Sequence, residues 1–309
     1  LRTARTALER GTPVLVQVPR RGYVPSVACG RCRTIARCRH CVGPLSLSDR
    51  DADGAVCRWC GRIDVGLKCR RCGAEAIRAV VVGARRTAEE LGRAFAGVTV
   101  ITSAGDSIRT EIGTGPALVV ATPGAEPRAP GGYGAALLLD GWSLLGRQDL
   151  RAAEDTLRRW MAAAAQVHSR AECGAVVVVA ESAIPTVQAL IKWDPVGHAE
   201  AELAARTAVA LPPAVHIAAV DGTAAAVAAL VGQAELPGDA DLLGPVDLPP
   251  GVRRPPGTGA DDNVIRMLIR VPRDEGLALA VSLRRAIAAS SSRHDHDAVR
   301  VQIDPLHIG

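Results

Sequence analysis

Four Cys-x-x-Cys pairs lie within residues 29–72 and decide the fold of this stretch: Cys29-Gly-Arg-Cys32, Cys38-Arg-His-Cys41, Cys57-Arg-Trp-Cys60 and Cys69-Arg-Arg-Cys72. A two-residue gap lets one tight turn present two thiolates to a zinc ion, which takes four tetrahedral ligands. Eight such thiolates therefore predict two structural zinc sites. A disulfide framework would need an oxidising compartment, which nothing in the sequence indicates. A redox centre would need one pair beside a βαβ unit, and iron–sulfur clusters use other spacings.

The spacing leaves two ways of combining the pairs. Sequential pairing joins the first pair to the second and the third to the fourth, whereas nested pairing joins outer to outer and inner to inner. The 15 residues between Cys41 and Cys57 fit an inner hairpin and favour nesting. Nesting assigns one zinc to the outer ligands (Cys29, Cys32, Cys69, Cys72) and one to the inner ligands (Cys38, Cys41, Cys57, Cys60).

The cysteine stretch is also the most basic part of the chain. Residues 20–71 hold 12 Lys or Arg and four Asp. Each zinc with four thiolates carries a charge of −2. One interpretation is that the interleaved arginines do no more than neutralise this charge. The alternative is a phosphate-binding or partner-binding surface on a rigid platform, for which the DNA-contact candidates are Arg20, Arg21, Arg31, Arg33, Arg37 and Arg39.

Short apolar segments alternate with helical patterns on either side of the cysteines, which predicts an α/β fold with a mostly parallel, doubly wound sheet. We expect strands at 13–18, 77–82, 98–102, 117–121, 135–139 and 175–180. We expect helices at 86–95, with Thr87 as its N-cap and Glu89 and Glu90 in its first turn, and at 149–166. The ninth cysteine, Cys173, precedes a strand and is expected to be a buried small residue.

Leu211-Pro212-Pro213 predicts a domain boundary. Beyond it, the pattern predicts a small α+β unit with strands at 215–220, 264–271 and 298–303, helices at 223–232 and 275–289, and a long loop at 236–262. His294 to Asp297 follow a serine run and are expected in a solvated loop. The expected domains are a lobe formed by 1–28 and 73–195, a cysteine module at 29–72, a linker helix at 196–210 and a C-terminal domain at 211–309.

The composition excludes several classes of protein. No run of about 18 apolar residues could span a membrane, and no apolar leader with a small-residue cleavage site is present. These features predict a cytoplasmic protein without a membrane partner. Aromatic residues make up only 2% of the chain, fewer than expected for a protein that reads single strands by base stacking. The chain opens at Leu1, inside an expected helix, so we expect further residues upstream.

Several motifs together resemble the PriA replication-restart helicases (primosomal protein N′). They are Arg20-Arg21-Gly22-Tyr23, the eight module cysteines, Thr87 to Phe95, Gln148 to Glu154, Leu211-Pro212-Pro213, Leu243-Gly244-Pro245 and Ile303-Asp304-Pro305. The resemblance covers nearly the whole chain. It implies a RecA-like second helicase lobe that carries the zinc module, followed by the family's C-terminal domain. It also implies nested zinc pairing, and an upstream DNA-binding domain and first helicase lobe.

The chain departs from this family at the motor motifs. The family's Gly-Thr-Gln-Met and Lys-Gly-His-Asp-Phe would fall at Ala121-Thr122-Pro123-Gly124 and beyond, where residues 125–130 read Ala-Glu-Pro-Arg-Ala-Pro. The two arginines of its Gln-Val-Ala-Gly-Arg-Ala-Gly-Arg motif would fall at Gln166 and Ser169, with Arg170 one residue late. Loss of an arginine finger typically costs about 10³ to 10⁵ in rate. We therefore expect no ATP-driven unwinding.

The resemblance implies a nucleoid-associated protein that binds abandoned or stalled forks and helps reload the replicative helicase. The implied partners are forked DNA, other primosome proteins, the replicative helicase or its loader, and single-stranded DNA-binding protein. The implied cofactors are two zinc ions, with ATP only if an upstream lobe is functional. Two alternatives remain open: an active 3′-to-5′ helicase with divergent motifs, and a zinc-ribbon scaffold that binds only proteins.

Overall fold

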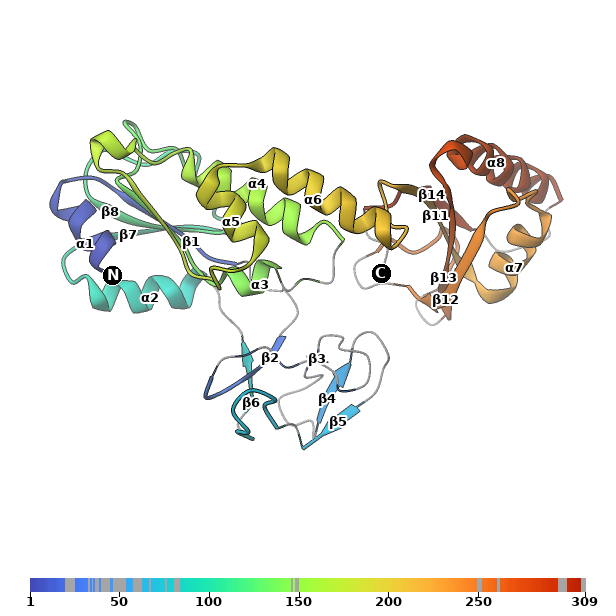
Figure 1. Cartoon of the computed structure of the whole chain (residues 1–309), viewed down its shortest axis with the longest axis horizontal. Coiled ribbons are helices and arrows are strands. Elements are labelled where there is room, and N and C mark those ends of the chain that lie inside the picture. Colours follow the sequence, from blue (N-terminus) through green and yellow to red (C-terminus); the bar gives the residue numbers. More distant parts are fainter. Residues whose placement is uncertain are drawn as a thin grey trace. The chain divides into compact units, whose positions relative to one another are not determined.

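The computed structural model shows a mixed α/β chain with two compact units, residues 1–195 and 196–309 (Figure 1). The residues it describes are 1–19, 26–32, 34, 36, 39, 45–46, 54–57, 63–66, 68–75, 77–80, 84–145, 147, 150–248, 252–259, 262–293 and 299–306. No helix among these residues has the length and apolar character needed to cross a membrane.

The first unit contains a parallel sheet with strand order β10-β9-β1-β8-β7. Its strands are β1 (Val14–Gln17), β7 (Thr99–Ser103), β8 (Ala117–Ala121), β9 (Ala135–Leu138) and β10 (Ala175–Val178). Every residue of β1, β8 and β9 is buried. Unbroken apolar runs of this kind are typical of strands covered on both faces. The predicted parallel sheet is therefore confirmed.

Helices cover both faces of this sheet. One apolar cluster joins α1 (Arg2–Glu9) and α2 (Ala84–Ala94) to one face. A second cluster joins the helices α3, α4 and α5 to the other face. Their bounds are Gly141–Leu145, Ala152–Ala164 and Pro185–Lys192. Trp160 of α4 is fully buried in the second cluster. This arrangement agrees with the predicted doubly wound architecture.

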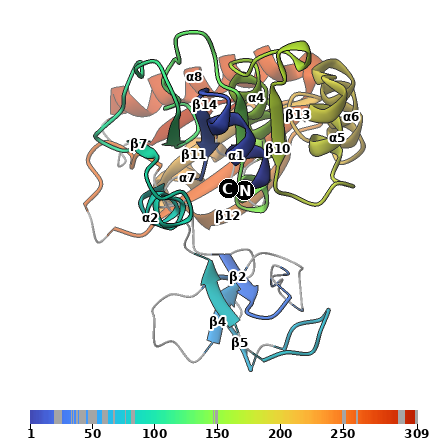
Figure 2. The ribbon, with the colours of Figure 1, turned by 90° about the vertical axis from the view of Figure 1, so that its left-hand side faces the viewer.

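A separate antiparallel sheet carries the cysteine module, with strand order β5-β4-β3-β2-β6. Strands β2, β4 and β5 of this sheet are labelled in Figure 2. The strands are β2 (Ser26–Cys29), β3 (Leu45–Ser46), β4 (Gly54–Cys57), β5 (Ile63–Val65) and β6 (Ile77–Val80). The strand expected at 77–82 is present as β6, but it pairs with β2 of this sheet rather than extending the parallel sheet.

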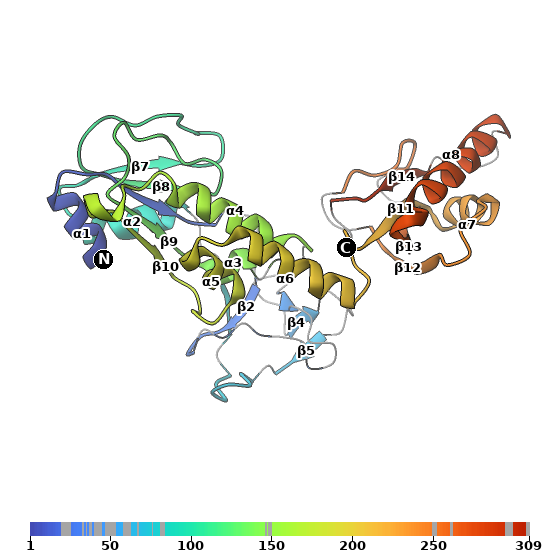
Figure 3. The same ribbon diagram turned by 45° about the horizontal axis from the view of Figure 1, so that its top comes forward.

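The second unit is an antiparallel sheet with strand order β12-β13-β11-β14. Its strands are β11 (Val215–Thr223), β12 (Asp241–Asp247), β13 (Val264–Pro272) and β14 (Arg300–Ile303), and its helices are α7 (Ala224–Gln233) and α8 (Gly276–Arg293). Figure 3 shows α7 and α8 side by side, and both pack into the same apolar cluster against β11 and β13. A further helix, α6 (Pro195–Ala208), covers most of the expected linker helix.

Four local predictions were wrong. Thr87 lies inside α2 rather than at its N-cap, because the helix begins at Ala84, and Glu89 and Glu90 consequently lie outside the first turn. Cys173 is exposed rather than buried, because it ends a short 3-10 helix with φ 62. The loop expected at 236–262 contains β12. Residues 294–297 lie outside the described residues.

Candidate metal centre

Two short turns, each closed by an equivalent backbone hydrogen bond, present the outer cysteines. In the first turn, the N–H of Cys29 donates to the carbonyl of Thr34 at 2.9 Å. In the second, the N–H of Cys69 donates to the carbonyl of Ala74, also at 2.9 Å. The same closing hydrogen bond, from a cysteine N–H to the carbonyl five residues later, therefore occurs twice, 40 residues apart in sequence. We call these loops, residues 29–34 and 69–74, the first and second knuckles.

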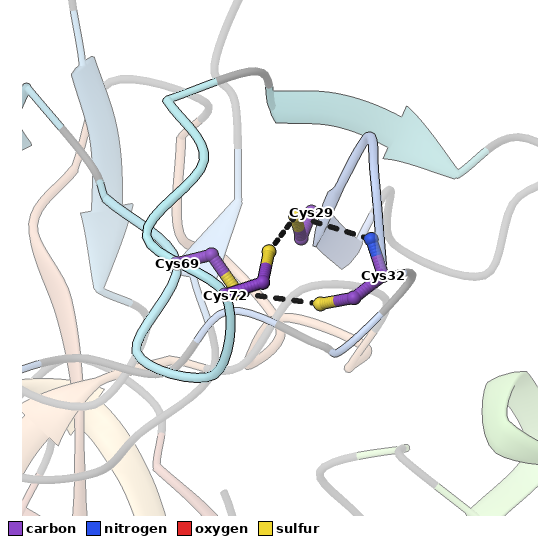
Figure 4. A group of neighbouring side chains, drawn as sticks. All are labelled: Cys29, Cys32, Cys69 and Cys72. Atoms are coloured by element: carbon purple, nitrogen blue, oxygen red, sulfur yellow. Dashed lines mark hydrogen bonds between the residues drawn. The ribbon is translucent and has the colours of Figure 1, made fainter.

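The two knuckles bring four sulfur atoms together (Figure 4). The Sγ atoms of the outer cysteines all lie within 4.8 Å of one another. Cys29 Sγ is 3.5 Å from Cys72 Sγ, and Cys32 Sγ is 3.4 Å from Cys69 Sγ. Four ligands at a zinc–sulfur distance of about 2.3 Å in a tetrahedron would be ~3.8 Å apart. The four free thiols therefore fit the donor set and the size of a four-thiolate metal site.

The electrostatics of the cluster favour a bound cation. The hydroxyl of Thr34, followed by its backbone N–H, lowers the pKa of Cys32 to about 6. The backbone N–H of Cys32 is the main cause of the lowered pKa of Cys29. At Cys72 the backbone N–H of Ala74 favours the thiolate, but burial and the neighbouring sulfurs prevail and raise the pKa to about 11. A divalent ion would remove this competition, because it stabilises all four thiolates together.

The cluster is the outer set that nested pairing requires. Sequential pairing would instead join Cys29 and Cys32 to Cys38 and Cys41, which lie outside the described residues. Of the inner set, Cys60 is also outside them, and Cys57 is described only as the last residue of β4. The second zinc site therefore stays a prediction.

The candidate DNA contacts are placed only in part. Arg31 is exposed in the turn between Cys29 and Cys32. Arg39 is exposed, and its Nε lies 3.5 Å from Asp64 Oδ2. The remaining candidates, which lie outside the described residues, are Arg20, Arg21, Arg33 and Arg37.

Thr34 is a polar neighbour of the cluster that the sequence analysis did not identify. Its Oγ1 lies 3.2 Å from Cys32 Sγ. The signal was present in the repeated spacing, because the residue two positions after the second cysteine of a Cys-x-x-Cys turn closes the knuckle. That position is Thr34 in the first knuckle and Ala74 in the second.

The segments that match the motor motifs lie in the parallel-sheet unit. Side chains from outside the connection between β8 and β9 donate hydrogen bonds to three of its residues. Arg159 Nη1 donates to the carbonyl of Pro123 at 2.9 Å, and Ser103 Oγ donates to that of Ala125 at 2.6 Å. Gln17 Nε2 donates to Glu126 Oε1 at 2.6 Å. These hydrogen bonds give the segment a structural role, because they attach it to β1, β7 and α4 of the same unit.

The second motif segment forms the turn between α4 and β10. The carbonyl of Gln166 accepts a hydrogen bond from the N–H of Tyr133 at 2.9 Å. Ser169 and Glu172 form a capping box around the short 3-10 helix Arg170–Glu172. The two positions matched to the family's arginines thus have structural roles in this turn.

Curated relatives match the chain over its whole length. A protein of Mycobacterium leprae, named "Probable replication restart protein PriA", is 71% identical over 309 residues, which is 100% of this chain and 48% of the relative. The chain belongs to the PriA family. A protein of Mycobacterium tuberculosis with the same name is 70% identical over 316 residues, again covering 100% of this chain and 48% of the relative.

A more distant PriA relative and a family model each match part of the chain. A Haemophilus influenzae protein named "Replication restart protein PriA" is 29% identical over 96 residues, 31% of this chain and 13% of the relative. The family model "Primosomal protein N C-terminal domain" matches residues 207–306, most of the second compact unit. The chain spans about half the length of the mycobacterial PriA proteins that it matches.

Proposed function

We propose that this chain forms part of a replication restart protein that binds abandoned or stalled forks and promotes reloading of the replicative helicase, without unwinding DNA itself. Two zinc ions hold its cysteine module, which is inserted in a RecA-like lobe. The protein acts in the cytoplasm at the nucleoid. Its partners are forked DNA, other primosome proteins, the helicase or its loader, and single-stranded DNA-binding protein. The restart role is supported by the names of its PriA relatives.

The observation that carries this proposal is the four-sulfur cluster bordered by exposed arginines. Arg31 lies within the first knuckle, and Arg70 and Arg71 lie within the second, all three exposed. Zinc with four thiolates carries −2, which is less than the charge of three guanidinium groups. The metal would fix these arginines on a rigid platform whose net charge attracts phosphate.

The lost-motor part of the proposal is supported by the two motif segments. The β8–β9 connection contains Pro127 and Pro130, and it has no lysine or histidine that could reach a phosphate. In the turn before β10, Gln166 and Ser169 occupy the positions matched to the arginines. Neither an amide nor a hydroxyl can supply the positive charge that stabilises a transferring phosphoryl group.

Binding to labelled DNA tests the proposal, with the 309-residue chain loaded with zinc. Fluorescence anisotropy would compare a fork, a single strand and a plain duplex over a series of salt concentrations. We expect tighter binding to the fork and a logarithmic affinity that falls linearly with log salt. Arg31→Gln should reduce the slope by about 1 if Arg31 meets one phosphate. Arg109→Gln, at an exposed position outside the module, is the matched control.

The other outcomes separate the rival functions. Absent or salt-insensitive DNA binding would overturn the fork-binding proposal and favour a protein-binding scaffold. ATP hydrolysis is measured on any longer protein that contains this chain. Turnover that depends on DNA, and that is abolished by changing a P-loop lysine, would restore the helicase alternative. Fork binding without such turnover supports a factor that acts by recognition.

A further inference from the structure

The two knuckles supply nearly the same backbone environment to their second cysteines. In each, the N–H of the first cysteine is bonded to the carbonyl five residues later, at 2.9 Å. In each, a backbone N–H two residues beyond the second cysteine faces its sulfur, from Thr34 for Cys32 and from Ala74 for Cys72. In these two backbone contacts, Cys32 and Cys72 are therefore equivalent.

The side chains at the equivalent positions differ. Thr34 Oγ1 is 3.2 Å from Cys32 Sγ, within reach of a hydrogen bond to sulfur. With the sulfur protonated, the thiol donates to the hydroxyl oxygen. With the sulfur present as a thiolate, it can only accept, so the hydroxyl donates. Ala74 offers a methyl group at the same place in the second knuckle and cannot donate.

We propose that Thr34 is a positioning residue of the metal centre, whose hydroxyl donates to the thiolate of Cys32 and makes the first knuckle the more firmly held half of the site. The inference rests on the proposed zinc at the outer cysteines. Groups that hydrogen-bond to metal ligands orient those ligands and typically contribute about 10- to 100-fold to metal affinity. The hydroxyl also withdraws charge from Cys32, which lowers its nucleophilicity.

Two consequences follow for the zinc-loaded protein. Cys32 should react more slowly with an electrophile than Cys72, because one of its lone pairs is engaged by Thr34. Attack on the site should therefore begin at the second knuckle. Removing the hydroxyl of Thr34 should abolish the difference in reactivity between Cys32 and Cys72. Introducing a hydroxyl at position 74 should reduce the difference by slowing the reaction of Cys72.

The test uses the zinc-loaded chain with limiting N-ethylmaleimide, and measures alkylation of each cysteine by fragmentation of the intact protein in a mass spectrometer. Because alkylation is measured at each cysteine separately, the reaction of the outer cysteines is distinguished from that of the inner cysteines. The variants are Thr34→Val, which removes the hydroxyl with little change in shape, Thr34→Ser, which retains it, and Ala74→Thr, the mirror substitution. Zinc transfer to a competing chelator gives the affinity of each variant.

We expect Cys32 to be alkylated more slowly than Cys72 in the wild type. Thr34→Val should accelerate Cys32 and weaken zinc binding by roughly tenfold, Thr34→Ser should restore both, and Ala74→Thr should slow Cys72. Equal alkylation of Cys32 in the wild type and Thr34→Val would overturn the inference alone. So would a Thr34→Ser variant that behaves like Thr34→Val. A wild type that retains no zinc at the outer cysteines would overturn the zinc proposal and this inference together.

Discussion

Asp221 and Arg266 face each other across β11 and β13, and both side chains are fully buried. Arg266 Nε donates to Asp221 Oδ1 at 2.7 Å, and Arg266 Nη2 donates to Oδ2 at 2.9 Å. This two-bond pair matches the planar fork of the guanidinium group to the carboxylate. This pairing offsets part of the cost of withdrawing two charges from water.

Removing one member of this pair should strongly destabilise the second unit. Asp221→Asn keeps the shape of the side chain but removes the negative charge opposite the buried guanidinium group of Arg266, and loss of one partner of a buried ion pair typically costs about 3–5 kcal/mol. The four tryptophans all lie before residue 196, so amide hydrogen exchange in β11 and β13 is the suitable measurement. The double variant Asp221→Leu/Arg266→Met should be much less destabilised than Asp221→Asn. Equal losses in both would contradict this account.

Asp155 should stabilise α4 in a pH-dependent way. Burial alone would raise the pKa of this carboxyl group, but hydrogen bonds from Arg158, Arg159 and Arg147 lower it to about 2. Because the pKa is lowered in the folded state, the ionised carboxylate of Asp155 stabilises the fold fully above about pH 4. This contribution to the free energy of unfolding is lost as the pH falls toward 2. Asp155→Asn should therefore cost about 2 kcal/mol at neutral pH and roughly half of that near pH 3.

Urea denaturation followed by tryptophan fluorescence measures this effect, because Trp160 lies on the same helix. Glu154→Gln is the control, since the side chains of Arg151 and Glu154 are 47% and 41% exposed, with 3.7 Å between the charged atoms. Exposed ion pairs contribute about 0–1 kcal/mol. A loss at Asp155 that stays constant from neutral to acid pH would argue against the electrostatic origin.

Gly141 has no room for a side chain. A Cβ atom there would lie 2.9 Å from Trp160 Cζ2 and 3.0 Å from Ala180 Cβ. Gly141→Ala should destabilise the first unit by about 1–3 kcal/mol, because the fully buried indole cannot move aside. Gly92→Ala in α2 is the contrasting variant, since its Cβ would be 3.7 Å from Val100. It should stabilise the helix by about 0.5–1 kcal/mol, so thermal unfolding of the two variants should shift in opposite directions.

Cys72→Ser should remove one zinc per chain, because a hydroxyl is a poorer zinc ligand than a thiolate and the set of four would be incomplete. Elemental analysis of the purified protein gives the zinc content. Cys173→Ser is the control, since Cys173 is exposed and lies outside the sulfur cluster. Unchanged zinc in Cys72→Ser would show that Cys72 is not a ligand, and loss of zinc in Cys173→Ser would show that zinc content does not report on the outer cysteines alone.

Prediction from the sequence was most accurate for strands whose residues are all buried. The strand at 117–121 was predicted with its observed bounds, because its apolar run is buried on both faces. In contrast, every residue of β12 is exposed, and Gly244-Pro245 lies inside it. An edge strand without a buried face has no alternating pattern, and Gly-Pro is typical of turns. Sequence spacing favoured nested cysteines, but the contact between Thr34 and Cys32 depends on side-chain positions that spacing does not specify.

The pairing of β2 with β6 has a consequence for the order in which the chain folds. About 66 residues separate Gln17 of β1 from Ala84 of α2, and joining the ends of so long a loop is slow. Ser26 and Val80 are partners across two adjacent strands, so a folded module joins the loop near its base and shortens the segment still to be closed to about 11 residues. The entropy of closure then falls by roughly 1.5 kcal/mol. A metal that folds the module first would therefore act as a kinetic clamp, and would speed assembly of the parallel sheet without being part of that sheet.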